Sequence, residues 1–226
     1  MMAAIERKSP QLGTGVYTYA EAARLLRVST AQVRGWAEGY VRRVGDGVKL
    51  GESVLQRPSV ETGLLTFYDV IELRFVKAFR DAGVALKEIV AAARLLAQEW
   101  ETAYPFARRD LYTDGRQLLR RAGPQYENVA NKQQVFEFIE AFFRDTDFED
   151  QMPQRWWPLG HEKLIVIDPH RSFGIPIHVK SGIRTDVLYS AYQAEQDTKA
   201  VADWYETDPE AVEAAVEFET RWLKAA

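Results

Sequence analysis

The sequence predicts an α+β protein that is mainly helical and has more than one folded unit. The chain has 226 residues, more than a typical single domain of roughly 100 to 200 residues. Hydrophobic residues make up 46% and charged residues 27%, as in ordinary globular proteins. Apolar residues recur mostly at steps of three and four, with short alternating stretches between them. We therefore expect a flexible N-terminus (1–15), a helical unit with a wing (16–103), a connecting hairpin and helix (104–163), and a small C-terminal winged unit (164–226).

Composition excludes several classes of function. The chain has no cysteine, so disulfide scaffolds, cysteine-ligated metals and thiol nucleophiles are excluded. No stretch approaches the ~20 apolar residues of a membrane span, and no leader peptide is evident, so we expect a cytoplasmic protein. The sequence shows no nucleophile–base set, phosphate loop or metal-ligand spacing, and we expect neither enzymatic activity nor a cofactor or metal.

The first unit begins with two short helices around a tight turn. Thr18 and Glu21 have the spacing of a capping box, in which each side chain bonds the other residue's backbone amide. Ser29 is the N-cap of a second helix that turns Val33 and Trp36 inward. This pattern predicts a helix-turn-helix.

The second helix of such a motif presents its first turns to the major groove of DNA. There Gln and Arg side chains reach base edges, and Ser or Thr hydroxyls reach phosphates. The candidate DNA-binding residues of this helix and its turn are Arg27, Ser29, Thr30, Gln32 and Arg34.

A β-hairpin is predicted directly after the second helix. Residues 40–50 alternate polar and apolar side chains around Gly45-Asp46-Gly47, a turn signal. This hairpin is a candidate wing, in which Arg42, Arg43 and Lys49 contact phosphates and so position the protein without reading sequence.

Two longer helices are predicted over 67–81 and 85–100, with Thr66 as a cap and Gly83 at a helix end. The order of elements over residues 16–98 resembles the winged helix-turn-helix of MerR-type regulators. Two departures are Gly35, where an aromatic residue is usual, and a lengthened wing connection over 51–63. No long coiled coil with cysteines follows, so metal or thiol sensing is not implied. The matching motifs are Tyr17-Thr18-Tyr19-Ala20-Glu21-Ala22-Ala23, Val28-Ser29, Val33-Arg34-x-Trp36, Leu73-Arg74-Phe75-Val76 and Ala82 to Ile89.

The connecting region is predicted to hold a β-hairpin over 104–124 and an amphipathic helix around 135–144. The aromatic face of that helix packs within the chain or against a second copy, and we assign Phe138 and Phe142 to a candidate dimer or partner interface. The acidic residues of 145–150 lack the spacing of a calcium loop, and we expect a solvated helix end.

The C-terminal unit is predicted to contain a buried strand over 163–168, an extended stretch over 173–177 and three helices, the last starting at Pro209. Residues 164–222 resemble the small winged-helix domain, of unknown function, of many VapB-type antitoxins. The resemblance implies a PIN-domain ribonuclease toxin as partner. It is carried by Ile167-Asp168-Pro169, Gly174-x-Pro176, Gly182-Ile183-Arg184-Thr185 and Asp208-x-Glu210-x-Val212-x-x-Ala215.

The two ends of the chain have opposite charge. Residues 1–57 hold nine Lys or Arg against five Asp or Glu, whereas residues 164–226 hold six against eleven. Carboxylates repel phosphates, so the C-terminal unit should be an assembly module rather than a DNA reader, with Val212 and Val216 at a dimer or partner interface. The last helix is expected to display Glu210, Glu213, Glu217 and Glu219 against Arg221 alone.

These observations predict a homodimeric DNA-binding antitoxin that neutralises a PIN-domain ribonuclease and represses its own operon through operator DNA. The alternative is a ligand-responsive MerR-like regulator. In that case, an aromatic small-molecule pocket would be formed by Trp100, Tyr104, Phe106 and Trp156.

Overall fold

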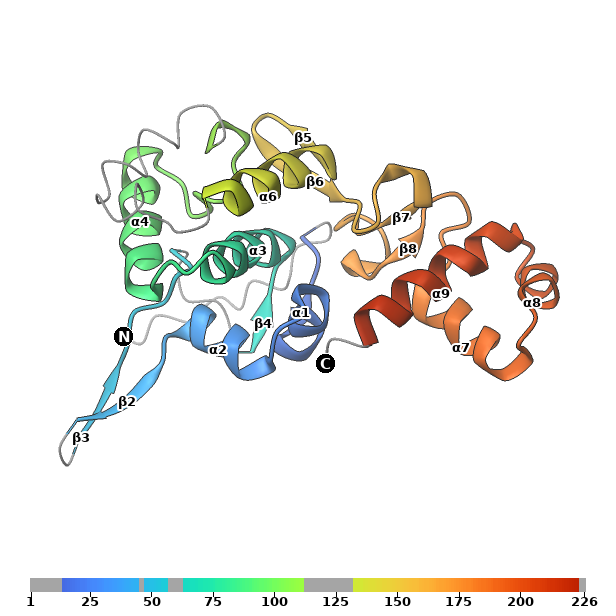
Figure 1. The fold of residues 1–226 in the computed structure, drawn as a ribbon, viewed down its shortest axis with the longest axis horizontal. Coiled ribbons are helices and arrows are strands. Elements are labelled where there is room, and N and C mark those ends of the chain that lie inside the picture. The colour runs from blue at the N-terminus through green and yellow to red at the C-terminus, as the bar shows by residue number, and fades with distance from the viewer. Residues whose placement is uncertain (1–13, 45–46, 57–62, 112–131, 224–226) are drawn as a thin grey trace, which may run out of the picture.

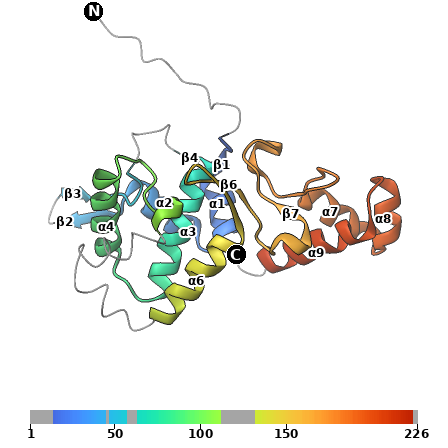
Figure 2. The ribbon, with the colours of Figure 1, turned by 90° about the horizontal axis from the view of Figure 1, so that it is seen from above.

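The structure is a computed structural model that describes residues 14–44, 47–56, 63–111 and 132–223 (Figure 1). Helices dominate, and the strands form small two-stranded antiparallel sheets, which confirms the predicted mainly helical α+β class. Within these ranges no helix is long and apolar enough to cross a membrane. We call residues 14–99 the head and residues 161–223 the tail, and the two lie side by side in both views (Figures 1 and 2).

The elements follow one another in the order head, connecting region, tail. The head contains β1 (Tyr17–Thr18), α1 (Tyr19–Leu26), α2 (Thr30–Glu38), β2 (Val41–Val44), β3 (Gly47–Leu50), β4 (Leu64–Leu65), α3 (Phe67–Asp81) and α4 (Leu86–Glu99). The connecting region contains the 3₁₀ turn η1 (Arg109–Leu111), α6 (Lys132–Arg144), β5 (Thr146–Glu149) and β6 (Met152–Trp156). The tail contains η3 (His161–Lys163), β7 (Ile165–Val166), η4 (Ser172–Gly174), β8 (Ile177–His178), α7 (Thr185–Glu195), α8 (Thr198–Trp204) and α9 (Pro209–Leu223).

Helices α1 and α2 form the predicted helix-turn-helix. The Thr18 hydroxyl accepts a hydrogen bond from the Glu21 amide, and the Ser29 hydroxyl accepts one from the Gln32 amide, both at 3.2 Å. Caps of this kind stabilise a helix by about 0.5–2 kcal/mol. Arg27 ends α1 in the left-handed conformation (φ 56°), which turns the chain into α2 within three residues.

Helix α3 forms the centre of the head. It begins at a further capping box, in which the Thr66 hydroxyl accepts a hydrogen bond from the Asp69 amide. Its Leu73 and Phe75 are fully buried, in one apolar core with residues of α1, α2 and α4. Helices α1, α3 and α4 therefore hold α2 against a continuous core.

The wing is anchored to α2 by three glycines. Gly39 has a φ of 91°, and a Cβ there would lie 2.0 Å from the Gly51 carbonyl oxygen. The Gly51 amide donates to the Tyr40 carbonyl at 2.8 Å. A Cβ at Gly35 would lie 2.2 Å from the Tyr40 ring, so the departure from the MerR-type pattern at this position makes room for Tyr40.

The turn and the second strand of the hairpin expected over 104–124 lie outside the described residues, and the described part, 104–111, contains no strand. Leu111 ends the turn η1, and residues 112–131 lie outside the described residues. The stretch before them packs on the head instead of pairing as a strand, because Phe106 and Ala107 are fully buried. The carboxylate of Glu72, from α3, accepts a hydrogen bond from the Ala107 amide at 2.6 Å and so holds this loop.

Helix α6 is present as predicted, and its aromatic face packs within the chain. The ring centroids of Phe138 and Phe142 lie 5.2 and 4.4 Å from that of Phe75 on α3. Phe142 is fully buried, so its assignment to a dimer or partner interface is wrong, and Phe138 belongs to the same internal contact.

Residues 145–150 form part of a β-hairpin rather than a solvated helix end. Strands β5 and β6 pair antiparallel, with Thr146 opposite Trp156. The Asp147 carboxylate accepts a hydrogen bond from the Trp157 indole at 2.9 Å, and its other oxygen lies 3.0 Å from the His161 ring nitrogen. Local pairing thus accounts for Asp147, and Asp145 pairs with Arg144.

The three predicted helices of the tail are present and pack on one another. Leu188, Val201 and Val212, one from each helix, are fully buried in a common cluster. The strand expected over 163–168 is shorter than predicted, and the extended stretch expected over 173–177 includes the end of the turn η4.

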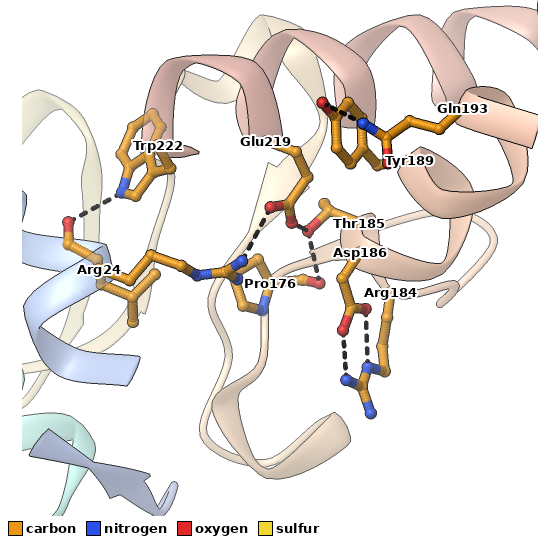
Figure 3. Close-up of polar contacts among 10 residues, drawn as sticks. Arg24, Pro176, Arg184, Thr185, Asp186, Tyr189, Gln193, Glu219 and Trp222 are labelled. Carbon is orange, nitrogen blue, oxygen red and sulfur yellow. Dashed lines mark hydrogen bonds and ion pairs between the residues drawn. The ribbon is translucent and has the colours of Figure 1, made fainter. Parts of the chain in front are cut away.

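Two sets of contacts join the tail to the head. The Tyr17 hydroxyl donates to the Gly174 carbonyl at 2.8 Å, where a Cβ on Gly174 would lie 2.1 Å from that hydroxyl. The second set joins α9 to α1 (Figure 3): the Trp222 indole donates to the Leu25 carbonyl at 2.9 Å, and Arg24 pairs with Glu219 at 3.0 Å. Both sets are largely buried, so head and tail form one continuous body.

Candidate nucleic-acid interface

Helix α2 and its N-cap carry the residues predicted to read bases and to bind phosphates at the start of the motif's second helix. Ser29, Thr30, Gln32 and Arg34 are exposed, whereas Val33 and Trp36 are buried. The exposed residues occupy the N-terminal part of the helix, where free backbone amides and the helix dipole favour a phosphate. A recognition helix needs exposed polar residues in its first turns, and α2 has them.

Gln32 has a structural task as well as a predicted binding task. Its side-chain oxygen accepts hydrogen bonds from the backbone amide and the hydroxyl of Ser29, both at 3.0 Å. If the side-chain oxygen of Gln32 bonded a base, part of this cap would be lost. The side-chain NH2 group of Gln32 can still donate hydrogen bonds.

Arg34 lies over an aromatic ring at the edge of the exposed face. Its guanidinium carbon is 5.7 Å from the centre of the Tyr19 ring, and the Tyr19 hydroxyl donates to the Glu38 carboxylate at 2.6 Å. Stacking uses the face of the guanidinium and leaves its edge available for hydrogen bonds. Arg34 is thus oriented and still accessible.

The wing projects from the head next to α2 (Figure 1). Its register places Arg42 directly opposite Lys49 and Arg43 opposite Val48. Two positions that hold basic residues therefore lie at the same level of the hairpin. The turn residues 45–46 lie outside the described residues.

Arg27, predicted to bind DNA, makes contacts with the tail that the sequence did not indicate. Its guanidinium donates to the Arg221 carbonyl at 2.7 Å and lies 4.8 Å from the centre of the Trp222 ring. Its neighbour Arg24 pairs with Glu219. Both arginines hold the tail against α1, so the sequence-based assignment of Arg27 to DNA is not supported by its contacts.

A depression next to α2 brings in a residue that sequence reasoning missed. It has a volume of about 370 Å³ and is lined by Gln32, Tyr40, Val41 and Arg80, among others. Arg80 is exposed and donates to the Val84 carbonyl at 2.6 Å at the end of α3. The sequence shows Arg80 as a basic residue in the last turn of α3. That Arg80 lies near α2 depends on tertiary packing, which the sequence does not show.

The tail residues predicted to form an interface lie inside the tail. Val212 is fully buried, and Val216 packs on the same cluster. Glu219, expected on the surface of α9, is 1% exposed. Its carboxylate accepts hydrogen bonds from Arg24 and from Thr185 (Figure 3).

Glu210 and Glu213 of α9 are exposed, as expected. Glu217 pairs with Lys163 at 2.9 Å and with Arg221 at 2.6 Å, and the hydrogen bond from Lys163 contributes most to lowering the pKa of the Glu217 carboxyl. The exposed surface of the last helix is thus less acidic than the sequence alone suggests, although it remains acidic at its start.

The aromatic residues expected to line a small-molecule pocket pack against other side chains of the protein. Phe106 is fully buried against Phe75. The guanidinium of Arg74 lies 4.0 Å from the centre of the Trp156 ring, and burial lowers the pKa of Arg74 to about 9. Arg108 lies over Trp100 in the same way, at 5.6 Å. These contacts give the alternative regulator hypothesis no support.

Comparisons with known proteins agree with this geometry. Residues 15–93 match a family described as "Putative DNA-binding HTH domain". The matched segment includes α1, α2, the wing and α3.

A protein and a solved structure, both from Mycobacterium tuberculosis, match nearly the whole chain. A protein named "Putative antitoxin VapB45" is 29% identical over 222 residues, which covers 89% of this chain and 92% of the relative. The crystal structure of Rv2018 superimposes with a TM-score of 0.68 at 24% identity and covers 92% of this chain and 99% of that one. The chain is therefore similar to a VapB-type antitoxin with a helix-turn-helix, and the solved structure shows the same fold.

Proposed function

We propose that this chain is a DNA-binding antitoxin that neutralises a ribonuclease of the PIN class and represses its own operon. The match to a DNA-binding helix-turn-helix family supports the DNA-binding part, and the similarity to a protein named an antitoxin supports the antitoxin part. The observation that carries the proposal is the exposure of Thr30, Gln32 and Arg34 on α2, directly before a wing whose sequence contains three basic residues.

In this proposal the protein acts as a homodimer on operator DNA. Two heads related by a two-fold axis meet half-sites about 34 Å apart, or a multiple of that distance, so the operator should be palindromic. Arg34 reads a base edge, while Arg42, Arg43 and Lys49 contact phosphates. Ser29 and Thr30 complete the phosphate contacts at the start of α2.

The proposal divides the two tasks between the head and the tail. The tail is acidic and is repelled by DNA, so it is the part available to a protein partner. Because α9 is bonded to α1 through Arg24 and Trp222, the tail keeps a fixed position while the head is on DNA.

The test is an anisotropy titration of a duplex that carries the DNA upstream of the chain's own gene. Arg34→Ala should weaken binding by about 1–3 kcal/mol, because one base-reading contact is lost. The matched control is Arg144→Ala, an exposed arginine at the end of α6 that pairs with Asp145. It should bind like the wild type.

Neutralisation is measured in parallel, as inhibition of the ribonuclease encoded beside this gene. The wild type and Arg34→Ala should inhibit equally. Loss of inhibition in Arg34→Ala would contradict the division of tasks, and equal DNA binding by wild type and Arg34→Ala would contradict the role of α2.

A further inference from the structure

Two adjacent aromatic side chains are exposed at the end of α8. Trp204 is 63% exposed and Tyr205 is 37% exposed. The other five tryptophans of the chain are buried or half-buried. Trp and Tyr, with Arg, are the residues most enriched at the energetic centres of protein interfaces.

The exposed pair stands on a rigid base. The helix α8 is capped by the Asp197 carboxylate, which accepts hydrogen bonds from the amides of Lys199 and Ala200. Val201 and Ala202, in the last turn before the pair, are buried in the tail cluster. An anchor that is already ordered loses little entropy when a partner binds, which favours affinity.

Carboxylates surround this pair. Between residues 195 and 210 the chain has six exposed acidic side chains and a single basic one, Lys199. Such a surface repels nucleic acid and attracts a basic protein surface. The six acidic residues are Glu195, Asp197, Asp203, Glu206, Asp208 and Glu210.

We infer that Trp204, Tyr205, Asp203 and Glu206, which we call the Trp204 patch, dock the basic RNA-binding face of the partner ribonuclease. This inference rests on the proposed function. An enzyme that binds RNA presents Lys and Arg to the phosphates, so an acidic surface that covers those side chains competes directly with the substrate. Trp204 provides a ring on which an arginine of that face can stack.

The position of the patch fits this role. Helix α8 lies at the end of the molecule opposite to the wing (Figure 1). The ribonuclease and the operator DNA therefore approach different ends of the chain and do not compete for one surface.

The experiment measures the dissociation constant between the full chain and the ribonuclease encoded beside its gene, by calorimetry. Trp204→Ala should weaken binding about 30-fold, as expected for the loss of one central aromatic anchor. The matched control is Phe173→Ala, which removes an aromatic ring of nearly equal exposure, 65%, elsewhere in the tail. It should change the dissociation constant less than about twofold.

A charge variant tests the rim without removing the anchor. The double variant Asp203→Lys and Glu206→Lys should weaken binding by at least tenfold and reduce its salt dependence. The matched control reverses two exposed carboxylates of the connecting region, Glu140→Lys and Glu149→Lys, and should bind like the wild type. Unchanged circular dichroism shows that each variant is folded.

The outcomes separate this inference from the proposed function. If the wild type does not bind the ribonuclease, both are wrong. If the wild type binds and the patch variants bind equally well, only the docking surface is wrong. Loss of dimerisation in Trp204→Ala with unchanged affinity for the ribonuclease would assign the patch to a contact between copies and overturn the inference.

Discussion

Glu219 is the residue whose removal should most disturb the contact between head and tail. Its buried carboxylate accepts hydrogen bonds from Thr185 at 2.6 Å and from Arg24 at 3.0 Å. Glu219→Ala leaves both donors without their partner, and we expect the free energy of unfolding to fall by about 1–3 kcal/mol. The measurement is urea denaturation followed by tryptophan fluorescence.

The control for this prediction is Glu217→Ala on the same helix. Glu217 pairs with Lys163 and Arg221, whose side chains are more than half exposed, so its removal should cost less than about 1 kcal/mol. Equal losses for the two variants would contradict the importance assigned to the buried junction.

Glu72 makes stability depend on pH. Burial raises the pKa of its carboxyl well above the ordinary value of 4.5, although hydrogen bonds from the Ala107 and Phe106 amides oppose that shift. The folded state thus holds a proton at pH values where the unfolded state has released it. Stability from this group is complete below pH 4.5 and is lost as the pH rises through the raised pKa.

Glu72→Gln should remove this dependence, because an amide cannot ionise and its oxygen still accepts from Ala107. The measurement compares the free energy of unfolding at pH 5 and pH 8 in wild type and variant. We expect a smaller loss between the two pH values in the variant. An identical loss would show that Glu72 does not contribute.

Local residue patterns were predictable, and distant pairs were not. The caps at Thr18, Ser29 and Thr66 depend on residues three positions apart, so the sequence alone identifies them. Arg24 and Glu219 are 195 positions apart, and nothing in either local sequence indicates that they meet. For this reason the contact of Arg27 with the tail was not predicted, whereas the exposure of Arg34 follows from its position in the helix.

At the level of elements, the wing depends on the close approach of backbone at Gly39. Gly39→Ala would place a Cβ 2.0 Å from the Gly51 carbonyl oxygen at a positive φ of 91°. The base of the wing has to shift, and we expect a stability loss of at least about 2 kcal/mol with weaker DNA binding. Thermal unfolding and the anisotropy titration measure the two effects.

Gly83→Ala is the matched control. Gly83 has almost the same φ, 89°, but no atom within 4 Å of the added Cβ, so only backbone strain of about 1 kcal/mol is expected. If both variants lose equal stability and bind DNA equally, the contact between Gly39 and Gly51 does not hold the wing.

Helices were easier to predict than hairpins in this chain. The apolar spacing of α3, α4, α6 and α9 persists over at least thirteen residues each, which identifies a helix without tertiary information. The β5–β6 hairpin was missed because Pro153 interrupts its second strand and Asp150-Gln151, with φ values of 44° and 72°, is not a typical turn pair. The hairpin predicted over 104–124 lies largely outside the described residues. Its described part, 104–111, contains no strand, and Phe106 there is buried in the core.

At the scale of the whole molecule, opposite charges are held apart by a rigid body. Helix α2 and the wing lie at one end of the molecule, and α8, in an acidic stretch of the chain, lies at the other (Figure 1). The junction between α1 and α9 joins the two ends and prevents the acidic tail from folding over the helix that we propose meets DNA. The charge difference between the two ends was evident in the sequence. The α1–α9 contacts that hold the two ends apart were not.

The most direct test of this account is the salt dependence of binding to the upstream DNA. If each head of a dimer neutralises three or four phosphates, the logarithm of the association constant should fall with the logarithm of the salt concentration, with a slope on the order of −6. The same titration with Arg42→Ala should give a shallower slope by about 2, since each dimer loses two phosphate contacts. A wild-type slope near zero would contradict the claim that the basic head docks on the phosphate backbone.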